Sequence, residues 1–106
     1  MGTMDGILRQ ELIRLKEAEK SYVREIKKLP KGSFQRKRIK GADYVYLVFR
    51  KGSKIVSRYL DHLAGEDMKK LKAEIELRKK YQRLLKEVRQ NMKRISKVLH
   101  GRRRTI

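Results

Sequence analysis

The sequence of 106 residues contains no cysteine, no tryptophan, a single proline and two histidines. Without cysteine the chain can form neither a disulfide nor a thiolate metal site, and it has no thiol nucleophile. His62 and His100 are too far apart in the sequence to form a typical metal-ligand pair, and no glycine-rich phosphate-binding loop is present. We therefore predict a non-enzyme without catalytic residues, metal, cofactor or small-molecule substrate.

Long apolar runs are also missing. No stretch of about 18 apolar residues occurs, so no membrane span and no membrane partner are expected. The N-terminal sequence lacks the basic start and apolar block of a signal peptide. We therefore expect a cytoplasmic protein.

Acidic residues are few, and this imbalance is the strongest signal in the composition. Lys and Arg total 31 against 12 Asp and Glu, which gives a formal net charge of +19. The excess is +2 in residues 1–30, +8 in residues 31–60 and +10 in residues 66–106. A field this positive attracts polyanions and accelerates their capture, which favours nucleic acid as the partner.

Two helical patterns flank the middle of the chain. In residues 5–29 apolar side chains recur at spacings of three and four, with Glu19 interrupting the stripe, and Pro30 ends the helix. A second amphipathic helix is predicted over residues 66–99, followed by a basic tail over residues 100–106. Because the second helix is longer than the first, part of its apolar stripe lacks a partner, which predicts a homodimer through this helix.

The period changes to two over residues 33–60, which predicts a three-stranded antiparallel meander with Gly41 and Gly52 at its turns. In the middle strand Val45, Leu47 and Phe49 form an apolar face that should pack on a helix. The predicted fold class is therefore α+β, in the order α-β-β-β-α with the helices paired antiparallel, and residues 1–106 form a single domain.

The strand register can be argued in part. A three-residue loop at 41–43 would place Arg38 beside Tyr46 and Arg36 beside Val48 on the outer face, whereas a two-residue loop would bury both arginines, which is costly. We therefore predict the three-residue loop. At the second turn a Gly52–Ser53 loop places Ser57 and Tyr59 outside, and a loop longer by one residue places Arg58 outside instead.

The meander supplies most of the candidate binding residues. Arginine and tyrosine side by side on an exposed sheet can contact phosphates, stack on bases and read base edges. The same tyrosines could stack on a single strand, or they could simply be strand formers that face water. The predicted nucleic-acid-binding residues are Arg36, Lys37, Arg38, Lys40, Tyr44, Tyr46, Arg50, Lys51, Lys54 and Arg58 in the meander, and Arg102, Arg103 and Arg104 in the tail.

The motifs "LPKGSF" and "IKGADYVYLVFRKGSKIVSRYL" resemble an uncharacterised family of small bacterial and archaeal proteins, over roughly residues 29–63. That resemblance implies a fold and no activity. Three strands followed by a helix are also loosely similar to the arm-type DNA-binding domain of tyrosine-recombinase integrases, whose sheet enters the major groove. This second resemblance implies that Arg36, Arg38, Tyr46 and Arg58 read DNA, although no recombinase segment follows here.

These features favour non-catalytic binding of duplex DNA by the outer face of the meander, with the second helix and the tail holding phosphates. A mobile element or a small regulator would use such a protein. Two alternatives stay open. One is a coiled-coil interaction module or toxin–antitoxin partner that docks an acidic protein, and the other is an RNA- or ribosome-associated protein.

Overall fold

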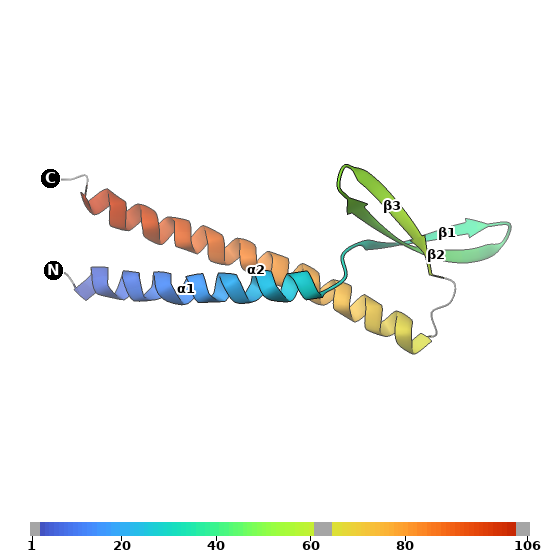
Figure 1. Ribbon diagram of the computed structural model, residues 1–106, viewed down its shortest axis with the longest axis horizontal. Helices are drawn as coiled ribbons and strands as arrows, with labels where there is room; N and C mark the ends of the chain where they lie inside the picture. Colours follow the sequence, from blue (N-terminus) through green and yellow to red (C-terminus); the bar gives the residue numbers. More distant parts are fainter. Residues whose placement is uncertain (1–2, 61–64, 104–106) are drawn as a thin grey trace. The chain divides into compact units, whose positions relative to one another are not determined.

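The computed structural model describes residues 3–60 and 65–103, and it confirms the predicted α+β class. The chain divides into two compact units. The helical unit pairs the first helix with residues 79–103, and the sheet unit contains Leu29–Arg78. The elements in chain order are α1 (Thr3–Lys28), β1 (Ser33–Ile39), β2 (Ala42–Lys51), β3 (Lys54–Tyr59) and α2 (Gly65–Arg103) (Figure 1).

In the helical unit, α1 packs antiparallel to the C-terminal part of α2, as the matching apolar stripes predicted (Figure 1). Leu15 and Val88 are buried in this unit, and the rings of Tyr22 and Tyr81 lie 5.8 Å apart. Glu19, which interrupts the stripe of α1, accepts a hydrogen bond of 3.0 Å from Nε of Arg89. The carboxylate is therefore paired across the two helices at a position where the stripe has no apolar side chain.

α2 extends four residues beyond the predicted end at Leu99. It passes through Gly101 and ends at Arg103, so Arg102 and Arg103 belong to the helix backbone and not to a frayed tail. A glycine in an exposed helix costs only about 1 kcal/mol relative to alanine, and it need not end the helix. Arg104, which was predicted to bind nucleic acid, lies outside the described residues.

The sheet unit contains an antiparallel meander in the order β1-β2-β3, as predicted. β2 pairs with β1 through residues 42–48 and with β3 through residues 46–51, so only residues 46–48 have neighbours on both sides. The rest of the sheet consists of two hairpins that project from opposite ends of β2 (Figure 1). We call residues 36–45 the β1–β2 ribbon and residues 49–56 the β2–β3 ribbon.

The core of the sheet unit lies beneath the middle of β2. Leu47, Leu60 and Ile75 are buried together, which confirms that the apolar face of β2 packs on a helix. The partly buried side chains around them are Phe34, Val45, Phe49, Met68 and Leu71. The sheet therefore covers the apolar side of α2 between Met68 and Ile75. Because the homodimer prediction assumed that part of this stripe lacks a partner, it stays a prediction without that support.

The predicted register between β1 and β2 is wrong. Arg36 pairs with Val45, Arg38 with Asp43 and Ile39 with Ala42, so the turn is the two-residue loop Lys40–Gly41. Both turn residues have positive φ, 51° and 84°, as the tight hairpin turns that match strand twist require. The expected burial penalty does not arise, because the core lies under Phe34 and Leu47 and leaves both arginines exposed.

The second turn follows one of the two predicted alternatives. Lys51 pairs with Lys54 around Gly52–Ser53, and Tyr46 pairs with Tyr59. Because directly paired residues of an antiparallel sheet share a face, Ser57 and Tyr59 lie on the side of Tyr46. Arg58 pairs with Leu47 and lies on the opposite side.

None of the helices in residues 3–60 and 65–103 has the length and apolar character that a membrane span requires.

Replacing Ile75 by alanine should destabilise the sheet unit, because its side chain is only 2% exposed and packs among Leu47 and Leu60. The expected loss in the free energy of unfolding is about 2–5 kcal/mol. The matched control is Leu77→Ala two residues along the same helix, where the side chain is 39% exposed. Denaturant titration followed by circular dichroism measures both, and equal losses would contradict the assigned core.

Replacing Gly32 by alanine should also destabilise the sheet unit. Gly32 has φ of 135°, and a Cβ there would lie 2.8 Å from Cδ1 of Leu47 and 2.9 Å from the carbonyl oxygen of Val48. Strain of this kind costs about 1–3 kcal/mol. The control is Gly6→Ala in α1, where a Cβ meets nothing within 4 Å and helix propensity favours alanine. A Gly32→Ala variant as stable as the parent would contradict the backbone conformation described at Gly32.

Candidate nucleic-acid interface

The face of the sheet that points away from the core of the sheet unit carries three of the five tyrosines of the chain. We call it the tyrosine face. The strand pairing places these side chains together, since paired residues share a face and neighbours along a strand alternate. Its members are Ser33, Gln35, Lys37 and Ile39 on β1, Ala42, Tyr44, Tyr46, Val48 and Arg50 on β2, and Ile55, Ser57 and Tyr59 on β3.

The three tyrosines form one aromatic cluster. The ring of Tyr59 lies 5.6 Å from that of Tyr44 and 5.2 Å from that of Tyr46, both in tilted geometry. Nζ of Lys37 lies 4.8 Å from the centre of the Tyr46 ring, a distance at which the ring attracts the ammonium group. Tyr59 is still 42% exposed. The cluster is therefore a partly exposed surface of rings with one cation over it.

Three of the arginines predicted as binding residues lie on the opposite face, whereas Arg50 lies on the tyrosine face. Arg36 and Arg38 share the side of Val45, and Arg58 shares the side of Leu47. The predicted placement of Arg36 and Arg38 was therefore wrong, because it rested on the three-residue loop. The position of Arg58 follows the predicted alternative in which Ser57 and Tyr59 lie outside. These three arginines are exposed and belong to β1 or β3, the two edge strands of the sheet. Their long side chains can reach beyond the strand edges.

The basic side chains of the meander form no ion pair with any carboxylate among the described residues. Within the part of the chain that the structure describes, the ion pairs join residues of the helices, and none includes a basic residue of the meander. Cations without a partner repel one another and are available to anions. This group consists of Arg36, Lys37, Arg38, Lys40, Arg50, Lys51, Lys54 and Arg58.

The two ribbons distribute these cations unevenly. Arg36, Lys37, Arg38 and Lys40 all lie in the β1–β2 ribbon, where Asp43 is the only acid. Arg50, Lys51 and Lys54 lie in the β2–β3 ribbon, and Arg58 lies beside the shared middle of the sheet. The predicted tail residues Arg102 and Arg103 belong to the helical unit and not to the sheet unit.

Gln35 and Ile39, two members of the tyrosine face on β1, were missed in the prediction of binding residues. Gln35 and Ile39 alternate with Arg36 and Arg38 along β1, and both are exposed. Their i, i+2 spacing with Lys37 is visible in the sequence, but the face to which this series belongs depends on the length of the turn. A two-residue turn at Lys40–Gly41 would have placed all three beside the tyrosines.

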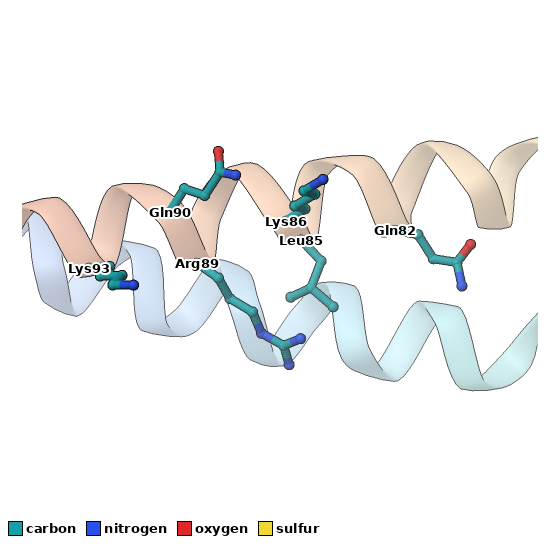
Figure 2. Close-up of a pocket in the computed structure, with 6 residues that line it drawn as sticks. All are labelled: Gln82, Leu85, Lys86, Arg89, Gln90 and Lys93. Carbon is teal, nitrogen blue, oxygen red and sulfur yellow. The ribbon is translucent and has the colours of Figure 1, made fainter.

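The helical unit carries a shallow groove of about 450 Å³ along α2 (Figure 2). Figure 2 shows Leu85 and Arg89 extending toward α1, whereas Gln90 points away from it. The charge of Arg89 is already balanced by Glu19, so the cations that remain in this groove are Lys86 and Lys93. The basic face of α2 is therefore a weaker candidate for a specific site than the meander.

One carboxyl group of α1 has a perturbed pKa. Its hydrogen bond with the Arg14 guanidinium, reinforced by the charge of that group, holds the pKa of Glu11 below its usual value. Both groups are on the surface of α1, where such pairs contribute little to stability. Residues 3–60 and 65–103 bring no three His, Asp or Glu side chains together as a metal site would need.

No protein-family model matches the sequence, and no curated protein and no solved structure matches it. The resemblances noted from the motifs stay predictions. The function is therefore argued from the residues of the sheet and their arrangement.

Replacing Tyr59 by alanine should destabilise the sheet, because this ring contacts both other tyrosines of the cluster. Each aromatic pair contributes about 0.5–1.5 kcal/mol beyond its buried area, so a total loss of about 1–3 kcal/mol is expected. The control is Ile55→Ala on the same strand and face, where the side chain is 68% exposed. Denaturant midpoints compare the two, and a Tyr59→Ala variant that loses no more stability than the control would contradict the cluster.

Proposed function

We propose that this protein binds duplex DNA without catalysis, and that the β1–β2 ribbon is its main contact. The observation that carries the proposal is the combination of shape and charge in this ribbon. It is two-stranded, it lies beyond the core of the sheet unit, and it carries four exposed basic residues that form no ion pair with the described carboxylates.

The dimensions of the ribbon favour B-form DNA. Paired strands lie about 4.8 Å apart, and a two-stranded ribbon with its side chains fits the major groove, which is about 12 Å wide. The major groove of A-form RNA is too deep and narrow for side chains to read. A ribbon with lysine and arginine side chains on both of its faces also suits a groove that has a phosphate backbone along each wall.

The positions of the arginines suit phosphate contacts. Arg36 and Arg38 lie on one edge strand of the sheet, and Arg58 lies on the other. A guanidinium group at a strand edge can bind a phosphate through two parallel N–H donors. Lys40, at the tip of the ribbon, can reach the backbone as a point charge. The helical unit adds positive charge that attracts DNA at longer range.

The competing functions differ from the proposed one in the ligand that the protein would bind most tightly. An interaction module would bind an acidic protein and show no retention on duplex DNA at about 0.2 M salt. An RNA-associated protein would bind structured RNA more tightly than duplex DNA at equal salt. Direct competition between the three ligands in one titration separates these functions from the proposed one.

Replacing Arg36 and Arg38 together by glutamine should weaken duplex binding and flatten its salt dependence. Each lost phosphate contact lowers the slope of log affinity against log salt by about one, so the double variant should lose about two. The matched control is Arg9→Gln with Arg24→Gln, which removes the same charge from exposed positions of α1. Fluorescence anisotropy over a salt series measures both slopes.

The control variant should keep nearly the whole slope, because its arginines lie outside the sheet unit. Equal slopes for the two double variants would mean that the salt dependence of DNA binding comes from the net charge of the protein and not from contacts of the ribbon. Failure of the parent protein to bind duplex DNA would refute the proposed function itself.

A further inference from the structure

We propose that Gln35, Lys37 and Ile39 read the base sequence of duplex DNA, while the neighbouring Arg36 and Arg38 hold phosphates. The inference rests on the proposed function and deepens it. The resemblance to integrases implied that Arg36 and Arg38 read the DNA sequence. The inference instead assigns sequence specificity to the residues that alternate with these arginines on the same strand. Three observations on β1 and its partner strand carry it.

The first observation is the direction in which the ribbon can approach a groove. In the sheet unit, α2 between Met68 and Ile75 packs against the face that contains Leu47. A helix on that side keeps the same face away from the floor of a groove. No described element of the sheet unit packs over the tyrosine face. This face of the ribbon, with Gln35 directly before the ribbon on the same edge strand, is therefore the face that meets base edges when the ribbon enters.

The second observation is the chemistry of the tyrosine face along β1. Gln35, Lys37 and Ile39 are all exposed, and they follow one another at every second position of the strand. A glutamine amide pairs with adenine N6 and N7, a lysine ammonium binds guanine O6 and N7, and an apolar side chain contacts the thymine methyl group. Ile39, 46% exposed, pairs with Ala42 and forms an apolar end to the series.

The third observation is the spacing. Residues two apart on one face of a strand lie about 6.8 Å apart, and successive base pairs rise by about 3.4 Å. A strand that runs along the groove therefore presents one reading side chain for every two base pairs. Gln35, Lys37 and Ile39 would then read positions spread over about five base pairs.

The tyrosine cluster lies beside two members of this series. Gln35 pairs with Tyr46 and Lys37 pairs with Tyr44 across the two strands. The ring of Tyr46 also holds Nζ of Lys37 at 4.8 Å on the tyrosine face. A side chain that is already ordered loses less conformational entropy when it binds. Lys37 is for this reason the strongest reader of the three.

An alanine scan along β1 tests the inference, because consecutive residues alternate between the two faces. The parent protein and the single variants Gln35→Ala, Arg36→Ala, Lys37→Ala, Arg38→Ala and Ile39→Ala are each used to select duplexes from a random DNA pool. Anisotropy at fixed salt then compares the selected duplex with single-base variants. All five side chains are exposed, so the fold should persist, and circular dichroism checks this.

The expected effect of each alanine variant depends on the face of β1 that carries the residue, so it alternates along the strand. Lys37→Ala and Gln35→Ala should each relax the preference at one position of the selected site, lowering discrimination there by about 5- to 150-fold. Ile39→Ala should relax a neighbouring thymine position by a smaller factor. Arg36→Ala and Arg38→Ala should weaken binding to all duplexes by the same factor and leave the preferred sequence unchanged.

Each other outcome overturns the inference in a recognisable way. A shift of the preferred sequence in the arginine variants alone would assign reading to the opposite face. Duplex binding without any selected sequence would refute the readers and leave the proposed function standing. Absence of duplex binding by the parent protein, or tighter binding to RNA, would refute both.

Discussion

The burial of Leu47 against Leu60 and Ile75 determines how the rest of the sheet is used. Side chains alternate along a strand, so placing Leu47 inward sends its neighbours Tyr46 and Val48 outward. The strand pairing then carries this choice to β1 and β3, where it separates the tyrosines from Arg36, Arg38 and Arg58. A single apolar contact beneath the middle of the meander thereby assigns a face to every side chain that could bind DNA.

The small size of this core has a consequence for charge. Only residues 46–48 of β2 have strands on both sides, and the ends of the meander extend beyond the buried centre. Cations at those ends keep their hydration and cost little to hold in the folded state, which explains why a two-residue turn beside Arg36 and Arg38 is tolerated. Asp43, opposite Arg38, is the only acid of the β1–β2 ribbon, so most of the mutual repulsion of these cations is not balanced, and a polyanion would relieve it.

α2 meets two different requirements along its length. Between Met68 and Ile75 its apolar side packs on the sheet, and from Tyr81 onward its apolar side packs on α1. The longer second helix therefore has partners within one chain for a stripe whose excess length had suggested a second copy. Polar interruptions of the stripe are accommodated by local pairing, as Glu19 and Arg89 illustrate.

The sequence by itself determined the order of the elements, the apolar face of β2, the turn positions and the concentration of positive charge in the meander. These features depend on local periodicity and on residues such as Pro30 and Gly52, so they can be read without knowing the fold. Only the tertiary structure decided the length of the first turn, and with it the face on which Arg36, Lys37 and Arg38 lie. The physical reason is that the free-energy cost of placing an arginine on the apolar face depends on how far the core extends along the strand. That extent is set by the packing of α2 against the sheet, and the sequence of a strand alone does not give it.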